Sequence, residues 1–264
     1  MIKLENTEVV GWEAAIRGMR NPMNSWKKSD SDYRPILCKR CDNCMSYQLE
    51  HWEDCEKCEV EMGTSSHNGF MIGPNDYDLM TRLRNSGTDH RKFMRMITVY
   101  LDITAPLYWW KEYDTYKVGT VANSCSTMHK IHAKEFTMED FSHEHLISDC
   151  NGDNNNAIWY KDPPKNGPID CPIMFSPLDA LRITIGVLNT NRKAYIETKD
   201  KKYWQQMIQL LPSSYNQKRT VMLNYEVLAN IYKSRRNHKL DEWHIFCDWI
   251  ENLPYSELIT GKKK

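Results

Sequence analysis

Five cysteines between positions 38 and 58 place the tightest constraint on how this chain folds. Cys38, Cys41 and Cys44 form a CxxCxxC pattern, and Cys55 with Cys58 forms a second CxxC. Two-residue spacing lets neighbouring thiolates bind one ion, and four thiolates complete the tetrahedral shell that Zn²⁺ favours in structural sites. The pattern predicts a structural zinc site with one cysteine to spare.

The spacing leaves the ligand set open. Cys38 can take the place of Cys44, and His51 and His67 are further donors. Inert reduced thiols, a disulfide pair and an iron–sulfur cluster are the alternatives to zinc. Without a signal peptide, however, clustered cysteines favour metal ligands over disulfides.

The cysteines lie in a segment whose composition differs from the rest of the 264-residue chain. Residues 27–68 are rich in charged residues and serine and poor in aliphatic ones, so they have little with which to build a core. The chain's length suits one large domain that carries an insert. We therefore expect a single domain over residues 1–264, with a cysteine-rich zinc-knuckle insert at 27–68.

Charge and hydropathy exclude several classes of protein. The 35 basic residues balance 35 acidic ones, which argues against a protein that coats nucleic-acid polymers or anionic lipid. No apolar stretch approaches the ~18 residues of a membrane span, and the N-terminus lacks the layout of a signal peptide. We expect a cytoplasmic protein with no membrane or nucleic-acid polymer partner.

Residue periodicity outlines the elements on either side of the insert. Strands are expected over 2–10 and 93–103, and helices over 11–20, 75–86, 105–114, 137–147, 177–195, 201–211 and 219–249, the last broken near Asn237. Residues 115–131 carry Gly119 among small polar residues, which is typical of a loop that approaches another group closely. Residues 150–177 predict either a lid or a surface excursion.

Helix caps and several single residues carry narrower expectations. Asn75 or Asp76 is expected to cap the helix over 75–86. A capping box of Thr137 and Asp140 is expected to begin the helix over 137–147. Cys125 is expected to be a small buried residue, because no base neighbours it.

Two pairs of large side chains allow both a structural and a functional interpretation. Trp109 and Trp110 favour a core position over stacking on a flat ligand ring. Arg235 and Arg236, together with Lys233, form either a solvated face or a phosphate clamp, and the sequence does not decide between them.

Three groups of residues carry a family resemblance. An acidic residue precedes His90, Phe93 follows it, and an Ala-Pro helix start lies at 105–108. Near the C-terminus, residues 211–236 contain an LP pair, a threonine and an asparagine in that order. Over roughly residues 70–250 the chain resembles the flavin-dependent thymidylate synthase (thymidylate synthase complementing protein) family. It also resembles an uncharacterised branch found in phages and anaerobic bacteria.

The resemblance implies a fold and a reaction. The fold is α/β (α+β), a sheet with long helices, and the assembly is a homotetramer with active sites between subunits. The activity is one-carbon transfer to a pyrimidine deoxynucleotide, with FAD as cofactor and folate as co-substrate. The location is the cytoplasm of a bacterial or phage-infected host cell.

The family signature R-H-R-x-x-S-x-N-E-x-S is altered in this chain. In order, its named positions hold Thr115, Tyr116, Lys117, Thr120, Ala122, Asn123 and Cys125. Asn224 matches the family's N-x-R motif, but Glu226 replaces the arginine and reverses a local charge. These losses favour a second interpretation, in which the chain is an inactive nucleotide sensor, sponge or interaction scaffold.

The loop and the matched positions define the expected site, without an assigned catalytic residue. The expected cofactor-binding residues are His90, Thr115, Tyr116, Lys117 and Asn224. The expected substrate-binding residues are Glu112, Thr120, Asn123, Ser124, Cys125, Ser126 and His129. Hydroxyls, one lysine and a glycine suit a phosphate, which needs hydrogen-bond donors and close backbone approach.

Protein purified without added zinc should contain about one equivalent of metal, because four thiolates bind Zn²⁺ tightly at neutral pH. Elemental analysis with parallel thiol titration measures this directly. Substoichiometric metal together with freely reactive thiols would refute the zinc prediction.

Overall fold

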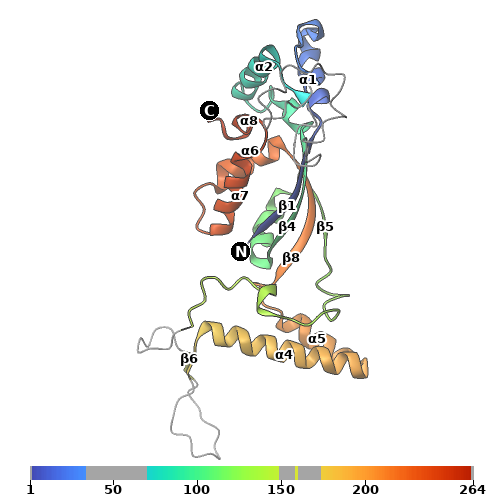
Figure 1. Cartoon of the computed structure of the whole chain (residues 1–264), viewed down its shortest axis with the longest axis vertical. Coiled ribbons are helices and arrows are strands. Elements are labelled where there is room, and N and C mark those ends of the chain that lie inside the picture. Colours follow the sequence, from blue (N-terminus) through green and yellow to red (C-terminus); the bar gives the residue numbers. More distant parts are fainter. Residues whose placement is uncertain (1, 34–69, 149–157, 160–173, 263–264) are drawn as a thin grey trace, which may run out of the picture. The chain divides into compact units, whose positions relative to one another are not determined.

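The computed structural model describes residues 2–33, 70–148, 158–159 and 174–262 (Figure 1). Its strands are β1 (Lys3–Val10), β2 (Asp32–Tyr33), β3 (Phe70–Met71), β4 (Thr98–Pro106), β5 (Val121–Ser124), β6 (Ile158–Trp159), β7 (Met174–Phe175) and β8 (Asn216–Asn224). Its α-helices are α1 (Trp12–Arg20), α2 (Pro74–Asn85), α3 (Leu107–Tyr113), α4 (Pro177–Thr198), α5 (Lys201–Leu210), α6 (Tyr225–Arg235), α7 (Asp241–Glu251) and α8 (Glu257–Thr260).

Short 3₁₀ helices complete these elements, at Asn21–Met23, Trp26–Lys28, Lys92–Arg95, Asp114–Tyr116 and Met138–Asp140. All five cysteines predicted to bind zinc lie outside the described residues, as do most of the 27–68 insert and most of the 150–177 segment. The zinc prediction therefore stays a prediction.

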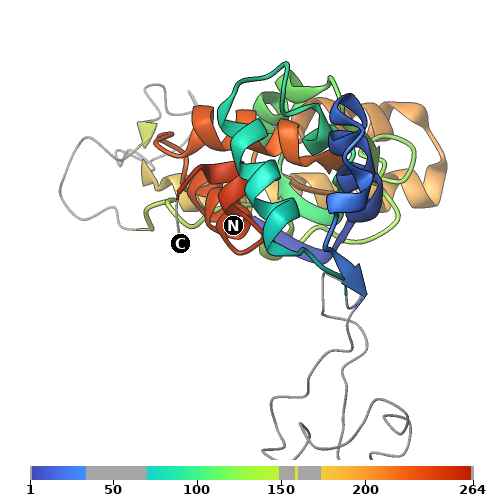
Figure 2. The same cartoon turned by 90° about the horizontal axis from the view of Figure 1, so that it is seen from above.

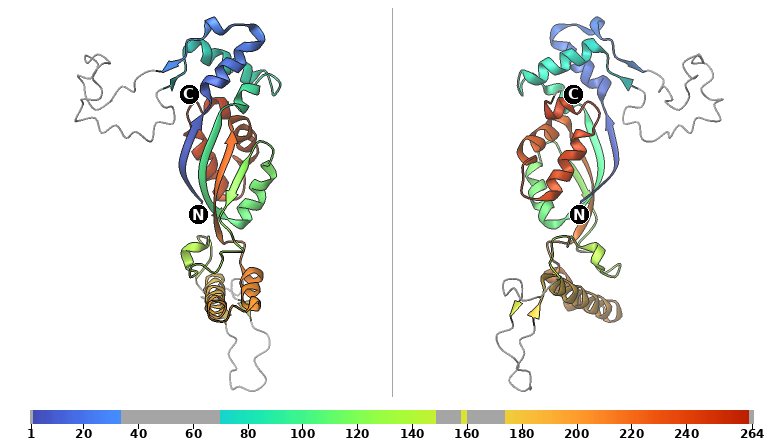
Figure 3. Two further views of the ribbon diagram at one scale, coloured as in Figure 1. Left: turned by 90° about the vertical axis from the view of Figure 1, so that its right-hand side faces the viewer. Right: turned by 60° about the vertical axis from the view of Figure 1, so that its left-hand side comes forward.

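An antiparallel four-stranded sheet, in the order β1-β4-β8-β5, is the centre of the fold (Figure 3). β4 alternates between its two faces, so Val99, Leu101 and Ile103 are buried. This period of two, with β-branched side chains on the buried face, is why the segment forms a strand. Two further antiparallel pairs, β2 with β3 and β6 with β7, lie outside this sheet.

β8 corrects the expected helix over residues 219–249. Val221 and Leu223 are buried on alternate positions, so the segment is a strand in the sheet. The helix begins only after Asn224, whose Oδ1 accepts a hydrogen bond from the Val227 N–H at 3.0 Å. The expected break near Asn237 is confirmed, because α6 ends at Arg235 and α7 begins at Asp241.

The chain divides into two compact units. Unit 1 comprises Met1–Lys3, Ile103–Thr115 and Asn123–Arg219, and unit 2 comprises Leu4–Asp102, Tyr116–Ala122 and Thr220–Lys264. The division falls within strands, so β4 and β8 each contribute residues to both units.

Unit 1 contains a helical hairpin with its own core. α4 and α5 pack against each other (Figures 1 and 3), and Leu188 on α4 and Met207 on α5 are fully buried. The turn between them places Lys199 at φ 57°, and Asp200 then caps α5 by accepting from the Lys202 N–H at 3.0 Å. Loop residues 131, 136 and 141 complete this apolar cluster.

In unit 2, α6, α7 and α8 pack on one another, and Trp243 and Phe246 of α7 are fully buried. The indole N–H of Trp249 donates to the Thr7 hydroxyl at 3.1 Å, which ties α7 to β1. α1 and α2 lie side by side in the same unit (Figure 2).

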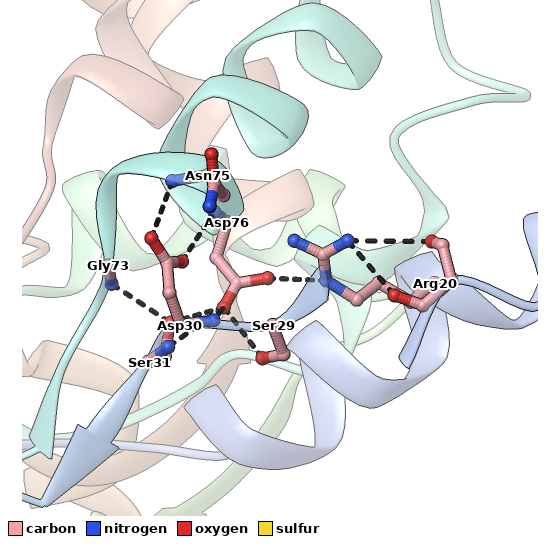
Figure 4. A network of polar contacts seen from close by, with 8 residues as sticks. Arg20, Ser29, Asp30, Ser31, Gly73, Asn75 and Asp76 are labelled. Carbon is pink, nitrogen blue, oxygen red and sulfur yellow. Dashed lines mark hydrogen bonds and ion pairs between the residues drawn. The ribbon is translucent and has the colours of Figure 1, made fainter. Parts of the chain in front are cut away.

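A buried carboxylate organises the start of α2 (Figure 4). Asp76 accepts hydrogen bonds from Arg20 Nε at 2.6 Å and from the Ser29 and Ser31 hydroxyls at 2.7 and 2.6 Å. The Asp30 carboxylate in turn accepts from the backbone N–H groups of Asn75 and Asp76, the unpaired donors of the helix N-terminus. The expected cap at Asn75 or Asp76 is therefore wrong, because Asp30 supplies it from a distant loop.

Two further expectations need correction. The capping box of Thr137 and Asp140 is present, but it begins only the 3₁₀ turn Met138–Asp140, and no helix continues to residue 147. Residues 115–131 are not wholly loop, because β5 lies within them.

Asp76→Asn should lower the free energy of unfolding by about 3–5 kcal/mol at pH 7, because Arg20 would keep a buried charge without its partner. Denaturant unfolding measures this. Asp78→Asn on the same helix is the control: its ion pair with Arg82 is exposed, so the cost should be below about 1 kcal/mol.

The ion pair between Arg20 and Asp76 also predicts how the free energy of unfolding depends on pH in acid. Burial raises the pKa of Asp76, but hydrogen bonds from Ser31, Ser29 and Arg20 outweigh it and leave the pKa below the ordinary 3.8. The ionised carboxylate thus stabilises the fold above about pH 4, and this stability is lost as pH falls through the folded-state pKa. Wild type should lose more stability than Asp76→Asn between pH 4 and pH 2, and equal losses would contradict the assignment.

Candidate functional site

The expected site residues are divided between the two units. Unit 2 contains His90, Tyr116, Lys117, Thr120 and Asn224. Unit 1 contains Glu112, Thr115, Asn123, Ser124, Cys125, Ser126 and His129. Each unit therefore offers its own candidate site.

In unit 2, the loop at 116–120 meets the N-terminus of α6. Gly119 has φ +82°, and a Cβ added there would lie 3.1 Å from Val227 Cγ2 and 3.2 Å from Asn224 Nδ2. The loop is closed by the Thr120 hydroxyl, which donates to the Tyr116 carbonyl at 2.8 Å. We call this arrangement the α6 cradle: Tyr116, Lys117, Gly119, Thr120 and Asn224.

Arg235 holds the cradle's first residue. Its Nε donates to the Tyr116 hydroxyl at 2.9 Å, and its guanidinium lies 4.8 Å from the Trp243 ring centroid. Arg236 pairs with Asp248 at 2.8 Å. Both arginines are thus engaged within the chain, which disfavours a phosphate clamp made by them, whereas Lys233 is exposed. The exposed Lys117 is the cradle's cation.

The charge reversed at Glu226 is neutralised by Arg91. Arg91 Nε lies 2.9 Å from Glu226 Oε2, and both side chains are largely buried. His90, next to Arg91, is exposed and lies in a turn. The carboxylate of Glu226 is therefore paired within the chain.

In unit 1, a cavity of about 250 Å³ opens beside Cys125. It is lined by Thr104, Cys125, Ser126, Thr127, Lys134, Glu139, Asp140, Tyr215, Asn216, Gln217 and Lys218. Of the expected substrate residues in this unit, Cys125 and Ser126 line this Cys125 cavity, whereas Glu112, Asn123, Ser124 and His129 do not. Cys125 is exposed, so the expectation that it is buried is wrong.

Hydrogen bonds to β8 position the cavity wall. The Cys125 N–H donates to the Lys218 carbonyl at 2.9 Å, and Gln217 Nε2 donates to the Cys125 carbonyl at 2.7 Å. The Ser126 hydroxyl accepts from the backbone N–H of His129 at 2.9 Å, which turns the chain away from the strand. His129 itself is exposed.

The charges that line the cavity balance. Lys134 pairs with Asp140, and this hydrogen bond raises the pKa of Lys134. Burial raises the pKa of Tyr215, so its phenol stays protonated at neutral pH. With two lysines against two carboxylates, the cavity suits a polar, uncharged hydrogen-bonding group.

Sequence reasoning missed most of this lining. Lys134, Tyr215 and Asn216 carry no motif, and Asp140 was noticed only for its capping box. The segment 211–236, which carries part of the family resemblance, contains Tyr215 and Asn216 and was the available signal for this lining. The sequence did not indicate that this segment contacts the loop over residues 115–131.

Trp109 and Trp110 are core residues, with 0% and 1% of their surfaces exposed. The indole N–H of Trp110 donates to the Gln217 carbonyl at 3.0 Å. Arg219 lies 4.1 Å from the Trp110 ring centroid and pairs with Asp114 at 2.9 Å. The structural interpretation of this pair is confirmed, and neither ring is left to stack on a ligand.

The described residues contain neither a cluster of metal-binding side chains nor a membrane-spanning helix. No cluster of three or more His, Cys, Asp or Glu side chains suited to a metal occurs among them. No helix in the described part of the chain is long and apolar enough to cross a membrane.

Gly119→Ala should lower the free energy of unfolding by about 1 kcal/mol or more, because the new methyl group is strained at φ +82° and crowds Val227 and Asn224. Gly186→Ala is the matched control: Gly186 lies within α4 with open space around it, so alanine should raise stability by about 0.5–1 kcal/mol. Thermal or denaturant unfolding measures both changes in the free energy of unfolding. Equal stabilisation of both variants would contradict the close approach at Gly119.

Comparisons with known proteins identify the fold. No family model matches the sequence, and no curated protein is significantly similar to it. Among solved structures, the chain is similar to flavin-dependent thymidylate synthase ThyX from Helicobacter pylori complexed with FAD and dUMP, with a TM-score of 0.57 and 13% identity, over 99% of this chain and 100% of that one. It is also similar to the UMP/dUMP methylase PolB from Streptomyces cacaoi bound with 5-Br dUMP, with a TM-score of 0.50 and 11% identity. This match covers 99% of this chain and 95% of that one. The chain therefore has the fold of a flavin-dependent thymidylate synthase.

Proposed function

We propose that this chain binds a pyrimidine deoxynucleotide and FAD, and transfers a one-carbon unit from a folate to the base. The observation that carries the proposal is a close approach at Gly119 between the loop at 116–120 and the start of α6. Both segments lie at positions that the resemblance aligns with motifs of the flavin-dependent thymidylate synthases. The solved structures that share the fold over nearly their whole length were obtained with FAD and dUMP or with 5-Br dUMP, which supports the same ligand classes here.

The α6 cradle fits the phosphate part of FAD. Gly119 has no side chain between the loop backbone and α6, and a helix N-terminus favours an anion. Lys117 is exposed and contributes a positive charge. Tyr116 and Asn224 are already engaged by Arg235 and Val227, so we assign them to shaping the cradle rather than to direct contact.

The Cys125 cavity fits the uncharged part of a nucleotide. Its hydroxyl and amide groups donate and accept hydrogen bonds, as the edge of a pyrimidine requires. The protonated Tyr215 phenol and the Asn216 amide orient the ligand, and the balanced charges avoid repelling a neutral ring. When bound, reduced FAD supplies the redox chemistry and folate the carbon unit, so this chain's residues bind and orient.

A nucleotide sensor without catalysis is the second candidate. The observation that favours it is that Arg91, Arg235 and Arg236 are all engaged by other side chains of this chain. A site with few free cations binds phosphates less tightly. It also stabilises less of the negative charge that develops in a transition state. The homotetramer and the cytoplasmic location also remain proposals.

Lys117→Ala should weaken FAD binding by about tenfold to a hundredfold, because a lost charge-assisted hydrogen bond costs about 1.5–3 kcal/mol. Titration followed by flavin fluorescence measures the affinity. Lys193→Ala, which removes an exposed lysine from α4, is the control and should bind like wild type.

The same titrations separate the two candidates. An enzyme should show flavin absorbance near ~450 nm that changes when dUMP is added. Binding of dUMP without FAD favours the sensor. If neither ligand binds wild type, both candidates fail, and unchanged FAD affinity in Lys117→Ala removes the cradle assignment.

A further inference from the structure

A second cavity, separate from both candidate sites, lies in unit 2 beside α1. It has a volume of about 400 Å³ and is lined by Glu13, Ile16, Arg17, Arg20, Trp26, Ser29, Ser31, Asp32 and Phe70. No residue of the α6 cradle or of the Cys125 cavity lines it. We call it the α1 cavity.

Arg20 brings a buried cation to this cavity. The residue is only 3% exposed. Its Nε donates to Asp76 at 2.6 Å, and its Nη1 donates to the Ser25 carbonyl at 3.2 Å. Figure 4 shows the third nitrogen without a dashed line, and Nη2 has no hydrogen bond to any residue that the structure describes.

Asp76 engages only one nitrogen, Nε, of this guanidinium. Its other oxygen, Oδ2, accepts from the Ser29 and Ser31 hydroxyls and from the backbone N–H groups of Asp30 and Ser31. Asp76 Oδ2 is held by these donors and only Oδ1 contacts Arg20, so Nη2 remains able to donate a hydrogen bond to an acceptor in the cavity. Nη2 is not among the buried side-chain atoms that lack a partner in the described part of the chain, so solvent reaches it and it can donate to a ligand in the cavity.

The other walls define what that partner is. Arg17 lies one turn before Arg20 on α1, is exposed, and has no ion pair among the described residues. Trp26, 50% exposed, and the buried Phe70 supply flat apolar surface. Glu13 and Asp32 add carboxylates that accept hydrogen bonds from N–H groups.

We propose that the α1 cavity is a second binding site, which takes a small flat molecule carrying one oxyanion and one N–H donor. The oxyanion binds Arg20 Nη2 and Arg17, the ring packs on Trp26, and the N–H group faces the carboxylates of Glu13 and Asp32. This site does not depend on the function proposed above, because no residue is shared.

The probe is 1-anilinonaphthalene-8-sulfonate, a flat fluorescent molecule with a sulfonate and an N–H group. Arg17→Ala should weaken its affinity about tenfold, because one charge-assisted contact is lost. Trp26→Ala should weaken it several-fold through loss of ring contact. Both side chains are at the surface, so both variants should fold, whereas Arg20→Ala would strand Asp76 and is not used.

Two controls make the result specific. Lys28→Ala removes an equal charge from the neighbouring 3₁₀ turn, outside the cavity lining, and should bind the probe like wild type. N-phenyl-1-naphthylamine, which lacks the sulfonate, should bind wild type more weakly and should be insensitive to Arg17→Ala. Wild-type affinity in both Arg17→Ala and Trp26→Ala, or equal binding of the charged and neutral probes, overturns the proposal.

Discussion

Both candidate sites depend on the pairing of one strand, β8, within the sheet. At its beginning, Gln217 and Lys218 bind the backbone of Cys125 and so form a wall of the Cys125 cavity. At its end, Asn224 caps α6 at the point where Gly119 approaches. Backbone hydrogen bonds set the register of a strand, and a slip of one residue would turn every side chain to the other face. The positions of the cavity wall and of the cradle are therefore set by this register.

The charged side chains around α6 are paired within the chain. Glu226 is neutralised by Arg91, and Arg235 is held between Tyr116 and Trp243. A buried charge without a partner would cost several kcal/mol, so each buried charge requires a compensating group. Arg91, Arg235 and Arg236 are therefore all engaged by other side chains, which is the physical basis for considering a sensor beside an enzyme.

Periodic segments were predictable from the sequence, and non-local contacts were not. The helix expected over 11–20 is confirmed. The strand expected over 93–103 forms only from Thr98, because Lys92–Arg95 is a 3₁₀ turn. The strand β8 was mistaken for helix because its apolar positions are also compatible with a helical face, and only pairing in the sheet decides. The cap of α2 was missed because Asp30 reaches it from more than forty positions away in the sequence.

The sequence by itself determined the type of most helices, the importance of Gly119 and the resemblance that pointed to this fold, because propensity, period and motif are local properties. Tertiary structure decided which expected residues act together. It placed Cys125 and Ser126 in a cavity with Lys134, Tyr215 and Asn216, and it left the other five expected substrate residues outside that lining. It also brought Arg20 to Asp76 and left one guanidinium nitrogen without a partner among the described residues. Such groupings arise from packing between distant segments, which no local pattern encodes.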